Sequence, residues 1–357
     1  MSPRIPADCV LPDPAAVHTV RSADGAELNV EEYGPEGAPL IVLAHGWTCA
    51  TTFWAPVINR LAGDFRVVAY DQRGHGRSPA PADAAGYGAG KLAEDLEAVL
   101  TATVPAGRRA VVAGHSMGGM TIMAAGGRPE VAARTAANVL LNTGAGELVD
   151  EQTVLPPFVR GRALRRLLSR PVLQSRLSLG PINGISRAVL KYATMGPATP
   201  PDRVEACAQV VHACPPKVRH RWSIVLDVLD VHAELARITA PTAVVTSSND
   251  KLTPPVHSRR IAAALADPRG LLELDGAGHM SPLERPAEVA DEIRRVAALV
   301  ADELAAGAAA DVPVGVAAGV SAGVSASVAL SDAESSAVES AAAFDIPSQS
   351  AAVEETA

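Results

Sequence analysis

Hydrophobic positions fall into two patterns along this chain. Near the N-terminus, Val17–Arg21 and Glu27–Tyr33 alternate apolar and polar residues on either side of a short polar turn. Alternation is typical of strands with one covered face, so these segments predict an antiparallel hairpin at a sheet edge. The later runs are continuously apolar, which indicates burial on both faces, as in a parallel sheet covered by helices. These runs are Leu40–Ala44, Val67–Tyr70, Ala110–Ala113, Val139–Leu141 and Ala243–Thr246, and Leu271–Asp275 is interpreted as a last strand.

Helical stretches separate most of these strands. In residues 91–103, for example, Leu92, Leu96, Val99 and Leu100 recur at helical spacing. Strands that alternate with helices predict a doubly wound, mostly parallel α/β sheet, here of eight strands. We interpret residues 1–16 as an N-terminal extension and residues 17–145 and 240–305 as two parts of one core. Residues 146–239 break the alternation with helical and proline-rich pieces and predict an insertion after the sixth strand.

The C-terminal segment, residues 306–357, has a different composition. Ala, Ser, Val and Gly dominate it, and Val316, Val320, Val324 and Val328 begin a four-residue repeat. No basic residue flanks its uncharged part, which disfavours a membrane span. The composition predicts a disordered, low-complexity acidic tail. An interaction tail or a weak surface anchor is the alternative, and we expect deletion of the segment to leave activity intact.

Charge and cysteine content exclude several classes of function. The net charge is −8, but no Lys or Arg follows Arg295, whereas nine Asp and Glu do. The body is therefore nearly neutral, and nothing indicates a nucleic-acid partner. The four cysteines show no C-x-x-C spacing, which suits a reducing compartment and argues against a metal site. The N-terminus lacks the apolar stretch of a signal peptide. We expect a cytoplasmic protein without stable membrane insertion, metal or cofactor. The sequence does not indicate its oligomeric state.

The strongest chemical signal lies at residues 110–119, Ala-Val-Val-Ala-Gly-His-Ser-Met-Gly-Gly. A buried strand runs into Ser116 and then into a helix, and only small residues fit two positions before and after such a turn, here Gly114 and Gly118. The turn exposes a hydroxyl where a base can reach it, so Ser116 is the predicted nucleophile. This pattern resembles the nucleophile elbow, G-x-S-x-G, of the α/β-hydrolase family.

The resemblance extends to the loop after the strand Leu40–Ala44, which reads His45-Gly46-Trp47. In α/β-hydrolases this loop supplies half of the oxyanion hole, and Gly46 allows the sharp turn that aims its N–H groups. The resemblance implies that the backbone N–H groups of Trp47 and Met117 bind the oxyanion. We expect His45 to support the loop through packing or hydrogen bonds.

The same family places its general base in a loop after the last strand. Gly276-Ala-Gly-His279 matches that position, and an imidazole can both accept and return the serine proton. The third member of the triad is predicted to be Asp250, which follows the seventh strand in a loop similar to the family's G-x-x-D-x-x-x-P. Asp275 is the local competitor. Some relatives place this acid after the sixth strand, where the present chain has Asn142.

Two further segments receive structural interpretations. Asp71-Gln-Arg-Gly-His-Gly-Arg-Ser78 resembles the family's D-x-R-G-x-G-x-S loop, and we expect an Asp71–Arg73 interaction to hold it. Residues 159–176 carry six arginines beside an apolar stripe of Leu164, Leu167 and Leu168. We interpret this segment as a solvated basic face on a helix of the family's cap, with an anion-binding lid as the alternative.

These motifs predict a serine hydrolase that cleaves a carboxylic ester with a mostly apolar acyl group through an acyl-enzyme. Ser116 in place of a nucleophilic aspartate disfavours epoxide hydrolases and haloalkane dehalogenases. Lactonases, C–C bond hydrolases and cofactor-free haloperoxidases or perhydrolases use the same triad and remain alternatives. A non-catalytic ligand-binding receptor on this fold is a further alternative, and so is an interaction protein that works through its tail.

Overall fold

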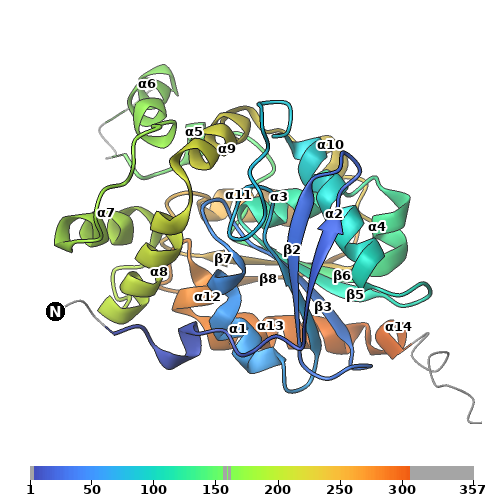
Figure 1. The fold of residues 1–357 in the computed structure, drawn as a ribbon. Coiled ribbons are helices and arrows are strands. Elements are labelled where there is room, and N and C mark those ends of the chain that lie inside the picture. The colour runs from blue at the N-terminus through green and yellow to red at the C-terminus, as the bar shows by residue number, and fades with distance from the viewer. Residues whose placement is uncertain (1–3, 156–158, 160–161, 306–357) are drawn as a thin grey trace, which may run out of the picture. The chain divides into compact units, whose positions relative to one another are not determined.

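Eight strands form a single sheet in the order β1-β2-β4-β3-β5-β6-β7-β8 (Figure 1). The structure, a computed structural model, describes residues 4–155, 159 and 162–305, so the tail predicted at 306–357 lies outside the described residues. β1 pairs with β2 and β2 with β4 in antiparallel fashion, and all other pairs are parallel. The predicted edge hairpin and the mostly parallel eight-stranded sheet are confirmed. The strands are β1 (Ala16–Arg21), β2 (Glu27–Tyr33), β3 (Leu40–Ala44), β4 (Arg66–Tyr70), β5 (Ala110–His115), β6 (Thr135–Leu141), β7 (Thr242–Ser247) and β8 (Pro268–Leu274).

Helices cover both faces of this sheet (Figure 1). One face packs against α1 (Ala55–Leu61), α12 (Ser281–Glu284), α13 (Pro286–Leu299) and α14 (Ala301–Ala305). The other packs against α2 (Ala89–Thr103), α3 (Met117–Ala124), α4 (Pro129–Arg134), α10 (His232–Leu235) and α11 (Pro255–Ala264). Two 3₁₀ helices, η1 (Ala7–Cys9) and η2 (Thr51–Trp54), precede α1. The last two helices, α13 and α14, are separated at Val300.

The continuous apolar runs reflect burial on both sides of the sheet. Val42 of β3 belongs to one hydrophobic cluster, whereas its neighbours Ile41 and Leu43 belong to the other. Successive side chains of a strand point to opposite faces, so a strand covered on both sides needs apolar residues at every position. This packing positions the carboxyl ends of the parallel strands at one edge, where the loops after β3, β5, β7 and β8 emerge.

Among the described residues, six helices lie between β6 and β7, where the sequence predicts an insertion. One of them, α10, covers the sheet, and the other five do not. They are α5 (Leu148–Glu151), α6 (Arg162–Leu173), α7 (Gly184–Thr194), α8 (Pro201–Ala213) and α9 (Pro216–Val228), and we call them the insertion helices. They lie outside the sheet-covering layers, with α6 and α7 farthest from the strands (Figure 1). None of the helices in the described ranges is both long enough and apolar enough to cross a bilayer.

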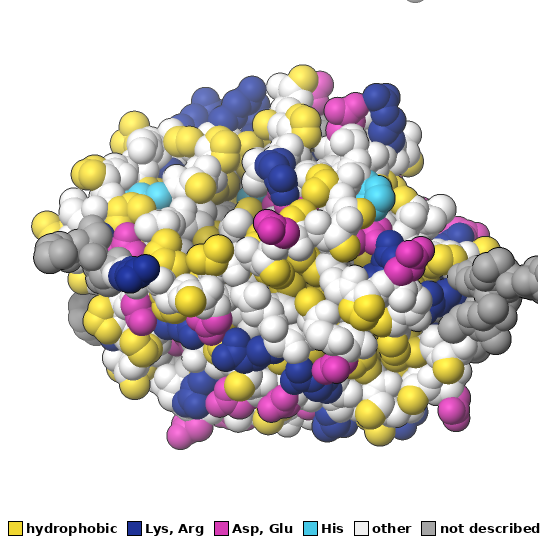
Figure 2. All heavy atoms as spheres, turned by 60° about the horizontal axis from the view of Figure 1, so that its bottom comes forward, with side chains coloured by type: hydrophobic (Ala, Val, Ile, Leu, Met, Phe, Trp, Pro, Cys, Tyr) yellow, Lys and Arg dark blue, Asp and Glu magenta, His cyan; other side chains and the backbone are white. Residues whose placement is uncertain are grey.

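On the face that carries α1 and α13, basic and acidic side chains lie next to one another (Figure 2). Ion pairs account for part of this mixture: Arg60 and Arg203 both contact Asp8, and Arg294 contacts Asp291. The pairs to Asp8 attach the N-terminal segment to α1 and to α8.

Candidate active site

Ser116 lies between β5 and α3 in a strained backbone conformation, with φ 52° and ψ −115°. Such positive φ values cost free energy in non-glycine residues and occur where the surrounding structure enforces them. A Cβ atom at Gly114 would lie 2.4 Å from the Gly118 carbonyl oxygen, and one at Gly118 would lie 2.0 Å from the Ala44 carbonyl oxygen. The predicted need for glycine at both positions is therefore confirmed. The tight packing of β3, β5 and α3 holds Ser116 at the carboxyl edge of the sheet.

The loop after β3 packs directly against this turn. A Cβ atom at Gly46 would lie 2.8 Å from His115 Nδ1 and 3.1 Å from Ser116 Cβ. His45 fixes the loop, because its Nε2 accepts a hydrogen bond from the Gln72 N–H at 3.0 Å and its Nδ1 donates to the Gly46 carbonyl at 2.7 Å. Burial lowers the pKa of His45 to about 4, so this ring is neutral. These hydrogen bonds fit the supporting role that the sequence predicts for His45, which stays a prediction.

Trp47 and Met117 flank Ser116 from two sides. Met117 is the first residue of α3, and the N–H groups of a helix's first turn have no acceptor within the helix. Trp47 is held by its side chain, since its indole Nε1 donates to the Arg219 carbonyl of α9 at 3.2 Å. Met117 and Met120 are buried in the hydrophobic core, and Trp47 packs at the edge of the same cluster.

Asp250 and His279 are hydrogen bonded in the buried interior of the same edge. His279 Nδ1 lies 2.9 Å from Asp250 Oδ2 and 3.1 Å from Oδ1. The backbone N–H groups of Leu252 and Thr253 each donate to Oδ1 at 2.9 Å, and the Thr253 hydroxyl donates to Oδ2 at 2.8 Å. Burial raises the pKa of Asp250, but the neighbouring imidazole and these donors outweigh it and hold the pKa below its usual 3.8. The carboxylate is thus ionised and aligned with the Nδ1 side of the imidazole.

Asn142 belongs to the same network, although the sequence identified it only as a place without a carboxylate. It follows β6 with φ 44°, and its Nδ2 donates to Asp250 Oδ2 and to Ser247 Oγ, each at 3.0 Å. Its Oδ1 accepts from Ser281 Oγ at 2.6 Å. The signal that could have identified Asn142 is that this polar residue comes directly after β6, the strand adjacent to β7. Asn142 therefore links the loop of Asp250 to the residues that follow His279.

Asp275 lies away from this network. Its side chain is exposed and accepts a hydrogen bond from Ser248 Oγ at 3.1 Å, and its backbone carbonyl accepts from Arg285. The carboxylate hydrogen bonded to His279 is that of Asp250, three residues beyond the end of β7 at Ser247.

Two hydrogen bonds of the His279 backbone hold its loop, one to the residue before Ser116 and one to α7. His115 Nε2 donates to the His279 carbonyl at 2.7 Å, and the two rings lie with centroids 4.9 Å apart. The His279 N–H donates to the Thr194 carbonyl at the end of α7, at 2.8 Å. Among the described residues, the Ser116 hydroxyl forms no hydrogen bond with His279. The insertion thus contacts the loop of His279 directly, and His115, the residue before Ser116, joins that loop to the strand-to-helix turn.

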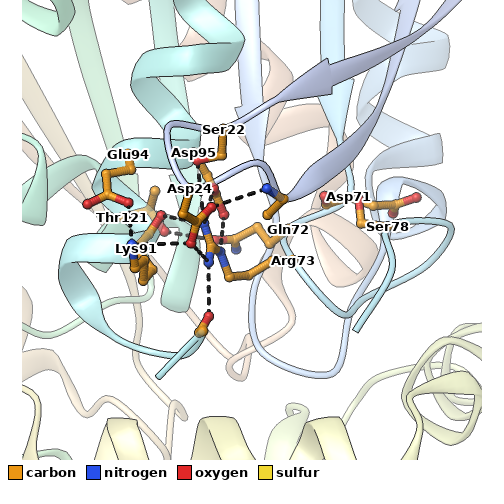
Figure 3. Close-up of polar contacts among 12 residues, drawn as sticks. Ser22, Asp24, Asp71, Gln72, Arg73, Ser78, Lys91, Glu94, Asp95 and Thr121 are labelled. Atoms are coloured by element: carbon orange, nitrogen blue, oxygen red, sulfur yellow. Dashed lines mark hydrogen bonds and ion pairs between the residues drawn. The ribbon is translucent and has the colours of Figure 1, made fainter. Parts of the chain in front are cut away.

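The predicted Asp71–Arg73 interaction is wrong. The Asp71 carboxylate accepts hydrogen bonds from the Thr51 and Arg77 N–H groups and from the Asn29 amide, at 2.8 to 3.0 Å. Arg73 turns the other way and pairs with Asp95 of α2 and with Asp24 of the β1–β2 turn (Figure 3). Each of the two side chains thus has its partners outside the pair, on other parts of the fold. The structural role of the loop is retained, because these bonds fix it at both ends.

A surface hollow of about 570 Å³ lies beside Arg73. Ser116, Asp250 and His279 are not among the residues that line it, so it is separate from the candidate site. No group of three or more His, Cys, Asp or Glu side chains in the described part of the chain is placed to hold a metal ion.

Comparisons with known proteins agree with this architecture. A model of the alpha/beta hydrolase family matches residues 41–292. The chain is 32% identical over 251 residues to "Putative carbamate hydrolase RutD" of Variovorax paradoxus, an alignment that covers 67% of this chain and 85% of that protein. It is 40% identical over 101 residues to the bifunctional esterase/perhydrolase DCH of Acinetobacter calcoaceticus, covering 28% of this chain and 35% of that protein.

Among solved structures, the thermophilic esterase from Thermogutta terrifontis resembles this fold with a TM-score of 0.65 and 22% identity. The match covers 80% of this chain and 99% of that one. The family model extends from within β3 to within α13, and the relatives named above are described as a hydrolase and esterases. The chain therefore belongs to the alpha/beta hydrolase family and is a hydrolase.

Proposed function

We propose that this protein hydrolyses a carboxylic ester through an acyl-enzyme formed on Ser116. The observation that carries the proposal is the buried Asp250–His279 pair, with a 2.9 Å hydrogen bond, beside a serine held in a strained strand-to-helix turn. Serine hydrolases need this combination, because a neutral hydroxyl becomes a nucleophile only when a positioned base removes its proton.

In the proposed mechanism His279 Nε2 accepts the proton of Ser116 as its Oγ attacks the carbonyl carbon of the ester. Asp250 fixes the proton of the imidazole on Nδ1 and stabilises the imidazolium that forms. The Trp47 and Met117 N–H groups bind the developing oxyanion, and each such donor contributes about 3 to 4 kcal/mol in related systems. The C–O bond to the alcohol then breaks, and the alcohol leaves with the proton from His279.

Water completes the cycle by the same chemistry. His279 removes a proton from water, the hydroxide attacks the acyl carbon, and the carboxylic acid departs while Ser116 regains its proton. A carbamate presents the same kind of carbonyl next to an ester oxygen. The relative described as a carbamate hydrolase makes carbamates the second substrate class to test.

A fluorophosphonate probe tests the nucleophile. We expect it to label the wild type and not Ser116→Ala, because the probe reacts with an activated serine. Ser186→Ala, which changes a half-buried serine in the first turn of α7, is the matched control and is expected to be labelled like the wild type. Equal labelling of wild type and Ser116→Ala overturns the assignment.

A substrate panel tests the reaction. It contains p-nitrophenyl esters of graded chain length, p-nitrophenyl carbamates, lactones, and peroxide with a carboxylic acid, each assayed with wild type and Ser116→Ala. We expect Ser116-dependent turnover of esters to be fastest. Faster turnover of carbamates, lactones or peracid formation would assign the chemistry to that class, and binding without turnover of the panel would favour a receptor.

A further inference from the structure

The two outermost insertion helices expose their apolar faces to solvent. On α6, Leu164, Leu167 and Leu168 are 45%, 67% and 44% exposed. Their i, i+3, i+4 spacing places them on one side of the helix. On α7, Ile185, Val189 and Tyr192 are 78%, 61% and 52% exposed at i, i+4, i+7 spacing. A helix on a globular surface normally turns its apolar stripe inward, whereas these two faces are turned to solvent. Of the six side chains, Tyr192 has partners within the chain: its hydroxyl donates to the Val154 carbonyl at 3.1 Å, and the Lys251 ammonium lies 3.6 Å from its ring centre. We call these six side chains the α6–α7 apolar surface.

The opposite sides of both helices face the protein. Ser169 of α6 is buried and accepts a hydrogen bond from Gln152 at 2.9 Å, and Arg170 pairs with Asp227 of α9 at 2.8 Å. On α7, Leu190 packs against the hydrophobic core beneath. The outward orientation of the apolar faces is therefore fixed by contacts on the other side of each helix. Both helices lie on the outer side of the insertion, away from the sheet (Figure 1).

Exposed large hydrophobic side chains concentrate in this part of the chain. Of the fifteen found among the described residues, eight lie between residues 164 and 192. A concentration of exposed apolar side chains commonly marks an interaction site in a soluble protein.

The same segment has one sign of charge. Between Glu151 and Asp202 the sequence contains no acidic residue and eight basic ones: Arg160, Arg162, Arg165, Arg166, Arg170, Arg176, Arg187 and Lys191. All 39 acidic residues of the chain lie outside this segment or at its limits. Of the 31 basic residues, 23 lie outside it. The face around α1 and α13, in contrast, mixes both signs (Figure 2). Two residues of the segment, Arg170 and Arg187, pair with Asp227 of α9 and Glu205 of α8. The remaining excess of basic residues in the sequence favours a negatively charged partner for the α6–α7 apolar surface.

We propose that the α6–α7 apolar surface docks the protein on an anionic lipid surface. Apolar helix faces combined with Lys and Arg are the features by which interfacial helices bind membranes, with the side chains entering the acyl boundary and the cations attracted to anionic headgroups. A second copy of the chain is a poor partner, because the contact would bring two acid-free cationic segments together. Docking of this kind is peripheral and needs no membrane-spanning helix.

Vesicle flotation with the full chain tests this proposal. We expect the wild type to float with vesicles of phosphatidylcholine mixed with phosphatidylglycerol, and to bind vesicles of phosphatidylcholine alone or at high salt at least about tenfold more weakly. The variant Leu164→Ser/Leu167→Ser/Leu168→Ser should bind mixed vesicles about 100-fold more weakly. Ile185→Ser/Val189→Ser tests α7 independently and should also weaken binding.

Leu299→Ser is the matched control, because Leu299 at the end of α13 is 53% exposed but lies outside the α6–α7 apolar surface. It should bind like the wild type. Thermal melts followed by circular dichroism should be the same for all variants, since every substituted side chain is exposed.

Absence of binding to mixed vesicles overturns the proposal, as does equal binding by wild type and by both surface variants, or equal loss in Leu299→Ser. A wild type that self-associates and does not bind vesicles would assign the surface to a second copy. Binding only after removal of residues 306–357 would also overturn the proposal, because the acidic tail would then occupy the surface.

Discussion

The Asp250 carboxylate receives four hydrogen bonds besides its contact with His279. They come from the N–H groups of Leu252 and Thr253, the Thr253 hydroxyl and the Asn142 amide. Charge-assisted bonds of this kind are stronger than neutral ones and fix both oxygens of the carboxylate. The proposed role of Asp250 depends on this fixed orientation, because a misaligned acid would no longer select the imidazole tautomer that can accept the Ser116 proton.

Asp250→Asn should therefore lower kcat by roughly 10⁴-fold, by analogy with the equivalent change in a chymotrypsin-type protease. An amide in this position can donate to Nδ1 and thereby stabilise the wrong tautomer of His279. Steady-state kinetics on the best ester of the panel measure the effect. Asp275→Asn is the matched control and should leave kcat within about twofold, since Asp275 is exposed and contacts Ser248. The reverse ranking of the two variants would transfer the role to Asp275.

At the level of elements, the close contact between β3, β5 and α3 determines where the serine lies. The Ala44 carbonyl of β3 approaches Gly118 so closely that no side chain fits between them. A packed interior yields little to an added methyl group, so the strand and the helix would have to separate.

Gly118→Ala should destabilise the protein by about 3 kcal/mol or more and abolish activity in any folded fraction. Gly90→Ala, within α2, is the matched control because a Cβ atom there meets nothing within 4 Å. Alanine favours the helix over glycine, so this variant should be neutral or more stable by about 0.5 to 1 kcal/mol. Urea unfolding of both variants measures the difference. Comparable stability of Gly118→Ala and wild type would contradict the packing argument.

Arg73 joins two other elements to the loop after β4. Its guanidinium pairs with Asp95 of α2 and with Asp24 of the β1–β2 turn, and it also donates to the Gly86 carbonyl (Figure 3). Arg73 and Asp95 are both 1% exposed. Burial alone would lower the pKa of Arg73, but its two carboxylate partners raise it above the usual value, so the guanidinium is charged.

Arg73→Met should cost about 3 to 5 kcal/mol, because it leaves the Asp95 carboxylate buried without a partner. The double variant Arg73→Met/Asp95→Leu should recover most of that loss. Arg259→Met removes an exposed pair with Glu273 and should cost less than about 1 kcal/mol. Chemical denaturation of the three variants measures these values. A double variant no more stable than Arg73→Met would contradict the explanation by an unpaired charge.

At the scale of the whole molecule, three buried histidines make stability depend on pH. Burial lowers the pKa of His45 to about 4 and those of His75 and His115 to about 3. In the unfolded chain each returns to its ordinary value near 6.5. Below that value the unfolded chain binds more protons than the folded one, so acidification favours unfolding.

We expect the free energy of unfolding to fall as the pH decreases from about 6.5 toward 4, by up to about 1.4 kcal/mol per pH unit for each histidine. Urea midpoints measured across this range give the slope. His75→Gln should be less stable than the wild type near neutral pH, because it loses the contact of His75 with Trp222, but its slope should be shallower. A midpoint that is constant or rises on acidification would contradict this expectation.

The sequence by itself determined the strands, the helices between them and the turn at Ser116. These features depend on near neighbours in the chain: a strand buried on both faces needs a continuous apolar run, and the elbow needs glycine at Gly114 and Gly118. The insertion after the sixth strand was predictable for the same reason, because it interrupts the alternation of strands and helices. The family resemblance added Asp250 and His279 as expectations.

Only the tertiary structure decided which side chains meet. Asn142 reaches Asp250 because β6 and β7 are adjacent in the sheet, although 108 positions separate the two residues. Arg73 pairs with Asp95 and Asp24 rather than with its near neighbour Asp71, because its partners come from elements that pack around the loop. The apolar stripe of α6 was visible in the sequence, but its outward direction depends on contacts of the opposite side of the helix. Periodicity is a local property of a chain, whereas the partner of a side chain is set by how distant elements pack.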